Sequence, residues 1–231
     1  MKPSFARTFR NFVVGTALAG CLVAAASASA TLVRYDLNPT KVDAPAGSST
    51  LAYTDQGYTI TASGYNNANG QGTLTPLYFK NAGAGEIGLG VANTTDHELQ
   101  VGSSTSNPFD FIQFDLTMLR NAGATDATFV VTSLQATETF TLFGSNVAGM
   151  LGTQIGGTYG GSDTSFTGSA QVPSLLYNYY SVAAGSGDVL PVSLSFQVPA
   201  PVPEMSALLP IIALLGLLGA VQVKRRRALR A

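Results

Sequence analysis

Short runs of apolar and β-branched residues, separated by glycine, asparagine and serine, recur along the middle of the chain. Apolar and polar residues alternate over most of Thr139 to Phe143 and throughout Val192 to Val198. Successive side chains of a strand point to opposite faces, so this alternation predicts strands with one buried and one wet face. In Phe109 to Leu116 the apolar residues fall on both faces, which predicts a central strand that is covered on both sides.

The expected strands cover residues 32–37, 57–62, 77–80, 98–101, 109–116, 128–134, 139–143, 177–183 and 189–198. No long stretch between them shows the 3.6-residue period of an amphipathic helix. Many short strands between turn-forming segments are typical of antiparallel architectures. The sequence therefore predicts an all-β fold, an antiparallel jelly-roll-like β-sandwich over residues 31–198. Three polar segments, 66–72, 103–108 and 156–168, are expected to be long loops.

A different pattern follows this region. A Pro-rich hinge, residues 199–206, precedes an apolar run from Ala207 to Val223 and the basic residues Lys224, Arg225, Arg226 and Arg227. At about 1.5 Å per helical residue, the run covers roughly 25 Å, and snorkelling or local thinning closes the gap to a hydrocarbon core of about 30 Å. The cations form a membrane stop on the cytoplasmic side. We expect a single transmembrane helix and basic cytoplasmic tail over residues 207–231, with the preceding domain outside.

The N-terminal residues 1–30 have the pattern of a secretory signal peptide. Three cations, Lys2, Arg7 and Arg10, precede an apolar segment from Phe12 to Ala26. Ala28 and Ala30 form a cleavage site of the A-x-A kind, which would begin the mature chain at Thr31. A competing interpretation takes Leu18 to Cys21 as a lipobox and makes Cys21 a lipidated N-terminus.

The hinge carries the first family resemblance. Val202, Pro203 and Glu204, followed by a short apolar helix and an arginine cluster, resemble the PEP-CTERM sorting signal of exported bacterial proteins. The family's signal reads Val-Pro-Glu-Pro, whereas this chain has Met205 in the last place. The resemblance implies an exosortase as partner at the inner membrane, which removes the helix and leaves the domain at the cell surface or outside the cell. The alternative is an anchor that stays in place.

A second resemblance lies within residues 88–190. Phe111 to Leu116, Phe140 to Asn146 and Tyr179 to Ala184 are similar to segments of discoidin-type or galactose-binding jelly rolls. This resemblance implies a sandwich fold, and jelly rolls of this type often hold a structural calcium ion.

Charge is distributed unevenly between the two ends of the chain and the domain between them. The chain has a formal net charge of −1, but residues 31–198 contain four basic and twelve acidic residues, a balance of −8. Such a domain is a poor partner for phosphate, so we expect no nucleic-acid binding. The single cysteine lies in the signal segment, so the exported domain would contain no disulfide.

Few residues offer catalytic chemistry. His97 is the only histidine, and neither a G-x-S-x-G nor an H-E-x-x-H motif occurs. The sequence therefore lacks the residue sets that common serine hydrolases and zinc proteases use for catalysis. Asp96, His97 and Glu98 could meet around a cation only in a turn, and the alternative is a plain polar loop. No cofactor is expected apart from a structural calcium, for which the oxygen-bearing candidates are Asn93, Asp96, Glu98 and Asp188.

Three functions remain open at this point. The first is a non-enzymatic structural or adhesive role in exopolysaccharide or biofilm. The second is a glycan-binding module, with five tyrosines as stacking groups: Tyr65, Tyr159, Tyr177, Tyr179 and Tyr180. The third is a glycoside hydrolase that uses Asp110 with Asp115, or Asp96 with Glu98. We expect the protein not to be an enzyme, and an extracellular polysaccharide is the expected partner.

Overall fold

The computed structural model describes residues 29–67, 71–83, 85–92, 94–101, 109–135, 137–160 and 166–200, together with 214–216, 218, 219, 222 and 228. Residues 30–199 form one compact unit, and residues 1–29 with 200–231 form another. In the second unit, the residues described between 214 and 228 are helical. Among the residues described, no helix combines the length and apolarity needed to cross a bilayer. Most of the predicted transmembrane segment lies outside the described residues.

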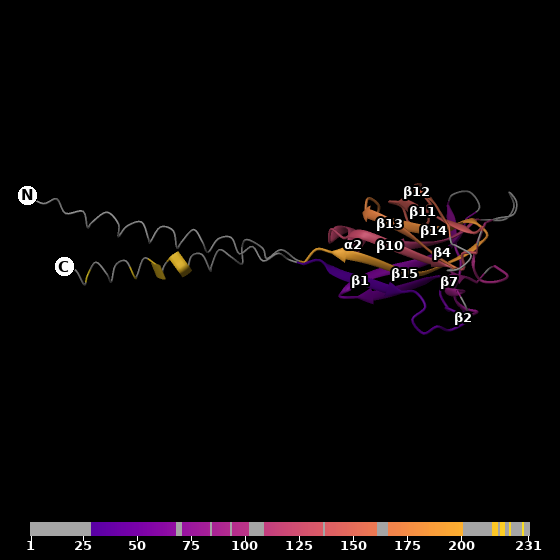
Figure 1. Cartoon of the computed structure of the whole chain (residues 1–231), viewed down its shortest axis with the longest axis horizontal. Coiled ribbons are helices and arrows are strands. Elements are labelled where there is room, and N and C mark those ends of the chain that lie inside the picture. The colour runs from indigo at the N-terminus through magenta and orange to yellow at the C-terminus, as the bar shows by residue number, and fades with distance from the viewer. Residues whose placement is uncertain are drawn as a thin grey trace, which may run out of the picture. The chain divides into compact units, whose positions relative to one another are not determined.

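Antiparallel strands make up residues 30–199 in three sheets (Figure 1). The first sheet has the order β1 (Thr31–Asp36), β15 (Asp188–Val198), β10 (Thr125–Thr132), β13 (Thr167–Ser174), with β8 (Leu99–Gln100) paired to β15. The second has the order β12 (Thr153–Gly160), β11 (Thr139–Ser145), β14 (Tyr179–Ser186), β9 (Phe109–Asp115), β4 (Tyr58–Asn67), β3 (Thr50–Asp55), with β5 (Gly72–Leu74) paired to β4. The third is β2 (Ala44–Pro45), β6 (Leu77–Asn81) and β7 (Ile87–Val91), and one short helix, α2 (Thr117–Asn121), follows β9.

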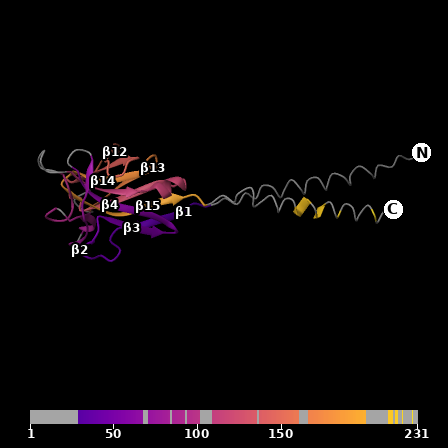
Figure 2. The same ribbon diagram turned by 180° about the vertical axis from the view of Figure 1, so that it is seen from behind.

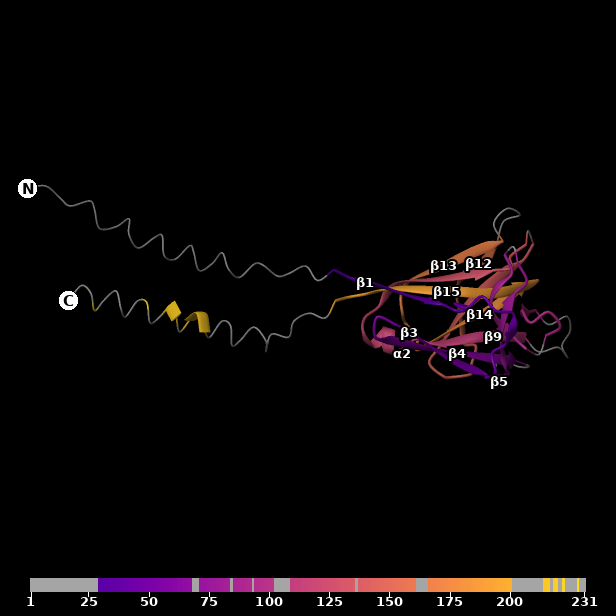
Figure 3. The same cartoon turned by 90° about the horizontal axis from the view of Figure 1, so that it is seen from below.

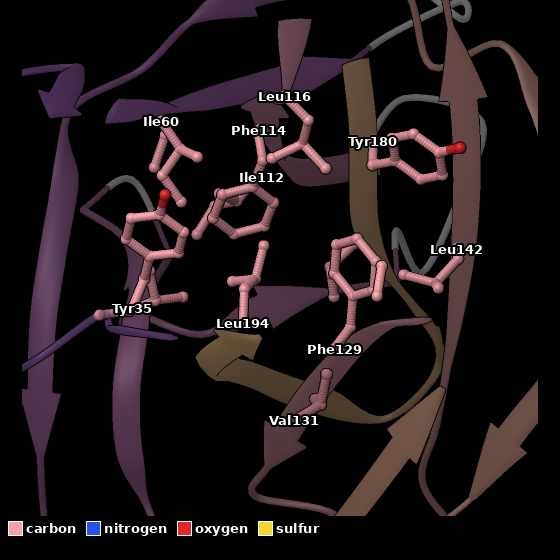
Figure 4. Close-up of a cluster of buried hydrophobic side chains, with 14 of the residues drawn as sticks. Tyr35, Ile60, Ile112, Phe114, Leu116, Phe129, Val131, Leu142, Tyr180 and Leu194 are labelled. Atoms are coloured by element: carbon pink, nitrogen blue, oxygen red, sulfur yellow. The ribbon is translucent and has the colours of Figure 1, made fainter. Parts of the chain in front are cut away.

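The two large sheets lie face to face and enclose the main core. Seen from below, β1, β15 and β13 lie in one layer and β3, β4 and β9 in the other (Figure 3). Phe129 of β10 lies near the centre of this core, with its ring close to those of Phe114 and Tyr180 (Figure 4). The ring of Phe196 contacts it edge-on. All four rings are at most 1 % exposed. The prediction of an antiparallel all-β sandwich is therefore confirmed.

Strand β9 is covered on both faces, as its sequence predicts. It lies between β14 and β4 in the second sheet. Ile112, Phe114 and Leu116 belong to the main core, whereas Phe111 belongs to a second cluster with Tyr65 and Ala183. The prediction that this segment is a central strand, made from its apolar residues on both faces, is therefore confirmed.

The expected loop over residues 156–168 is in part wrong. Residues 156–160 belong to β12 and residues 167 and 168 to β13, while 161–165 lie outside the described residues. Both strands lie at the ends of the strand order in their sheets. An edge tolerates residues of low strand propensity, such as Gly156, Gly157 and Pro173, so these strands resemble loops in sequence.

The two ends of this unit lie side by side. Strand β1 pairs with β15 so that Thr31 stands opposite Val198 (Figures 1 and 2). Thr31 is also the residue that the predicted signal cleavage would make N-terminal. Strand β15 has 11 residues, so at about 3.3 Å per residue its first residue, Asp188, lies roughly 33 Å from the end where both termini leave.

Candidate functional site

Three carboxylates gather at the end of the unit opposite its termini. Asp96 and Glu98 precede β8, and Asp188 begins β15. Strands β8 and β15 pair with Asp188 opposite Gln100, which brings these distant segments together. One carboxylate oxygen from each of Asp96, Glu98 and Asp188 lies within 4.8 Å of the other two. We call these three residues the acidic cluster.

A bend at His97 lets Asp96 and Glu98 converge. The backbone of His97 has a φ of 66°, in the left-handed region that turns a chain sharply. The imidazole turns toward Tyr78 and stacks on it with a centroid distance of 3.9 Å. A Cβ at position 90 would collide with the His97 carbonyl, so Gly90 is needed for β7 to pass this close. His97 is therefore outside the acidic cluster, and Asp96 and Glu98 meet in a turn rather than on a strand.

Side-chain amides and hydroxyls hold the bend. The Oδ1 atom of Asp96 accepts a hydrogen bond of 2.7 Å from the Gln100 side chain and one of 3.4 Å from the Glu98 amide. The Thr94 hydroxyl donates to the Glu98 carbonyl at 3.0 Å. These contacts fix the Asp96 carboxylate beside that of Glu98.

Glu98 is the buried member of the cluster, with an exposed fraction of 2 %. Its Oε1 atom lies 2.5 Å from the Lys80 ammonium and accepts a 3.0 Å hydrogen bond from the Ser133 hydroxyl. Burial raises the pKa of Glu98, and the bonds from Lys80 and Ser133 oppose that rise. Burial also lowers the pKa of Lys80, but its bonds and attraction to Glu98 and Glu86 outweigh burial, so the net shift is upward. The net shift of the Glu98 pKa is upward, and the shift stays limited because its carboxylate is in direct contact with Lys80 and Ser133.

Lys80 compensates the negative charge of Asp188 only in part. Burial, then repulsion from Asp96 and the hydrogen bond that protonated Asp188 donates to it, then repulsion from Glu138, raise the pKa of Asp188 from 3.8 to about 6. Lys80 opposes this shift. The cluster thus gains stability when Asp188 takes up a proton, or when a cation neutralises the repulsion between Asp96 and Asp188.

Three of the four calcium candidates from the sequence are thus brought together, and Asn93 lies outside the described residues. Calcium takes six to eight oxygen ligands, usually from carboxylates, carbonyls and water. Asp96, Glu98 and Asp188 offer carboxylate oxygens of the right kind at the right separation. Calcium binding here stays a prediction.

Neither carboxylate pair proposed for glycoside hydrolysis is placed for it. Asp110 and Asp115 are five positions apart on β9, an odd separation that puts their side chains on opposite faces of the sheet. Asp110 is 4 % exposed. Asp96 and Glu98 do converge, but the Glu98 carboxylate is enclosed and held by Lys80 and Ser133.

The five candidate tyrosines separate into two groups. Tyr180 is fully buried, Tyr177 packs edge-on against it at 6.1 Å, and Tyr159 stacks on Phe140 at 5.2 Å. These three are packing residues. Tyr65, which is 8 % exposed and also packs on Phe111, and the half-buried Tyr179 border a pocket of about 180 Å³ on the outer face of the second sheet. The sequence pointed to both tyrosines and to Asp115, but not to Thr61, Ser63 and Gln113, although the alternation along β4 places Thr61, Ser63 and Tyr65 on one face.

Of the residues predicted for signal cleavage, sorting and the membrane stop, the structure describes Ala30. Ala28, Val202, Pro203, Glu204 and the basic residues 224–227 lie outside the described residues, and Ala30 is an exposed residue directly before β1.

No family model matches this sequence, and no curated protein matches it. Among solved structures, the chain is similar to the K1 cleaved adhesin domain of Lys-gingipain from Porphyromonas gingivalis W83. The similarity covers 73 % of this chain and 95 % of that one, with 12 % identity and a TM-score of 0.25. A TM-score of this size does not establish a common fold, and we take no function from it.

The pKa of Asp188 predicts a pH dependence of stability. The folded state binds a proton at Asp188 up to about pH 6, whereas the unfolded state releases it near pH 3.8, so this group's contribution to stability falls as pH rises between those values. We expect the full chain, measured in EDTA, to gain melting temperature relative to Asp188→Asn when the pH drops from 7 to 5. An unchanged difference between the two proteins at both pH values would contradict this.

At neutral pH, where Asp188 has lost its proton, we expect calcium to stabilise the acidic cluster instead. We expect titration of the full chain with calcium chloride to give binding heat and a higher melting temperature, because the ion neutralises Asp96 and Asp188. The double variant Asp96→Asn, Asp188→Asn serves as control and should give neither. Absence of heat and of any thermal shift in the unsubstituted chain would refute the calcium site.

Proposed function

We propose that this chain is an exported bacterial protein of the cell surface or extracellular matrix, with a non-enzymatic structural or adhesive role in exopolysaccharide or biofilm. The proposal rests on the order of three segments along the chain. A compact β-sandwich unit, residues 30–199, stands between a sequence typical of a secretory signal and one that resembles a PEP-CTERM sorting signal.

The pairing of β1 with β15 supports this order. Thr31 stands opposite Val198, so the predicted signal cleavage and the sorting hinge belong to the same end of the unit. Neither predicted cut removes a paired residue of β1 or β15, so the sandwich keeps its strands after both. The exosortase and the inner membrane are the partners proposed for this step.

The position of the acidic cluster also fits a displayed domain. Asp188 lies at the other end of β15 from Val198. A domain tethered through Val198 would present the cluster away from its point of attachment. A surface with uncompensated carboxylates at that end suits contacts that depend on cations, as in a hydrated polymer matrix.

The carboxylate geometry favours this role over hydrolysis. Retaining and inverting glycosidases need two carboxyl groups on either side of one glycosidic bond. Asp110 and Asp115 lie on opposite faces of a sheet, and Glu98 is 2 % exposed and paired with Lys80. A binding role needs none of these groups to reach a substrate.

Processing of the tail tests the proposal. We expect the full chain, expressed in a host with an exosortase, to become shorter and to leave the membrane fraction, because the sorting helix is removed. Glu204→Ala should keep the tail, since it changes the motif itself. Met205→Pro, which restores the family's Val-Pro-Glu-Pro, is the matched control and should be processed at least as fast as the natural sequence.

Gel mobility and fractionation report the outcome, with a host that lacks the exosortase as reference. Equal size and equal membrane association of the unsubstituted chain in both hosts would overturn the sorting proposal.

A further inference from the structure

The outer face of the second sheet carries a pocket that the acidic cluster does not involve. Its lining residues come from the adjacent strands β4, β9 and β14 and from the turn after β11: Thr61, Ser63, Tyr65, Gln113, Asp115, Ala148 and Tyr179. We call this the sheet-face pocket. Its volume of about 180 Å³ is below the roughly 300–1,000 Å³ of drug-sized sites, so it suits a ligand of about one ring.

Strand register explains why these side chains share one face. On β4, Thr61, Ser63 and Tyr65 are two residues apart, so all three point outward. Thr61 stands opposite Asp115, and Ser63 opposite Gln113. On the other side of β9, Tyr179 pairs with Asp115. The pocket is therefore built on three hydrogen-bonded strands rather than on mobile loops.

Gln113 makes the floor of the pocket rigid. Its exposed fraction is 2 %, and its side-chain amide donates to the Met150 carbonyl at 3.0 Å and to the Ser181 hydroxyl at 3.2 Å. Its Oε1 atom accepts a 2.7 Å hydrogen bond from the Gly149 amide. These bonds hold the turn that supplies Ala148 against the sheet.

Tyr65 forms a fixed wall. Its ring stacks on Phe111 with a centroid distance of 5.0 Å and an interplanar angle of 20°. Gly72 lies directly against this ring, because a Cβ at that position would come within 2.6 Å of Tyr65. A wall that is already ordered costs little conformational entropy when a ligand binds.

The lining combines two kinds of surface that a sugar ring needs. Tyr179, which is half-buried, offers aromatic surface for the apolar C–H face of the ring beside the largely buried Tyr65. Thr61, Ser63 and Asp115 offer hydroxyl and carboxylate groups for its rim of hydroxyls. The Asp115 Oδ1 atom accepts a 2.9 Å bond from the Thr117 amide, and a carboxylate has further lone pairs for a ligand.

Charge selects among sugars. The lining contains one acid, Asp115, and neither lysine nor arginine. Residues 31–198 carry a formal balance of −8, so an acidic sugar would be repelled. The chemistry favours a neutral sugar with free hydroxyls.

We propose that the sheet-face pocket binds one neutral sugar unit of an extracellular polysaccharide. The identity of the polymer as extracellular rests on the proposed function, whereas the sugar class follows from the pocket alone. A single-ring ligand in a pocket of this size binds weakly, with a Kd of about 1 mM, so attachment to a polymer would depend on many such contacts.

Affinity electrophoresis of the full chain tests this proposal, in a detergent without a sugar headgroup. Gels contain soluble glucan, galactan or mannan as neutral probes, or polygalacturonate as the acidic probe. We expect at least one neutral polymer to retard the chain and polygalacturonate to leave its mobility unchanged. Tyr179→Ala should weaken the retardation at least tenfold, because it removes one aromatic wall.

Two further variants separate binding from folding. Asp115→Asn keeps an oxygen for the Thr117 amide and should weaken retardation while leaving the melting temperature unchanged. Phe166→Ala removes a ring that is 38 % exposed outside the pocket and should leave retardation unchanged. No retardation by any neutral polymer, stronger retardation by polygalacturonate, or equal retardation of all variants would overturn the proposal. Failure of tail processing would overturn the sorting proposal alone.

Discussion

The buried ion pair between Lys80 and Glu98 is the interaction on which this end of the molecule depends. Lys80 lies on β6 in the small sheet, and Glu98 lies in the bend before β8, which pairs with β15 of the first large sheet. Ser133, directly after β10, donates to the same Glu98 oxygen. Three separate segments therefore meet at one carboxylate. A carboxyl group with 2 % exposure is costly to bury unless its oxygens have partners, and Lys80 and Ser133 supply them.

The same pair sets the electrostatics of the acidic cluster. Because the Lys80 ammonium lies against Glu98, the charges on Asp96 and Asp188 stay close together with little compensation, and the pKa of Asp188 rises to about 6. This end of the sandwich therefore responds to protons and cations, while the rigid sheet-face pocket offers hydroxyl, amide and aromatic groups with a single acid, Asp115. The two sites call for different ligands, and both suit a protein that works in a hydrated extracellular polymer.

Much of the fold could be predicted from alternation along the chain, as for residues 139–143 and 192–198, because burial of one face imposes a period of two on a strand. Edge strands β12 and β13 could not, since glycine and proline are acceptable there. Asp96, Glu98 and Asp188 could be named as cation candidates from their chemistry alone. Their juxtaposition, the neutralising Lys80 and the pocket around Tyr179 could not be predicted, because they depend on strand register and on pairing between distant segments.

A double-mutant cycle on Lys80 and Glu98 tests the central claim most directly, with the free energy of unfolding of the full chain measured by urea. If the pair is the constraint, Lys80→Met and Glu98→Gln each lower that free energy by about 3–5 kcal/mol, since each leaves one buried group without its partner. The double variant should lose far less than the sum of the two. Strictly additive losses, or single losses under about 1 kcal/mol as for an exposed pair, would contradict the account.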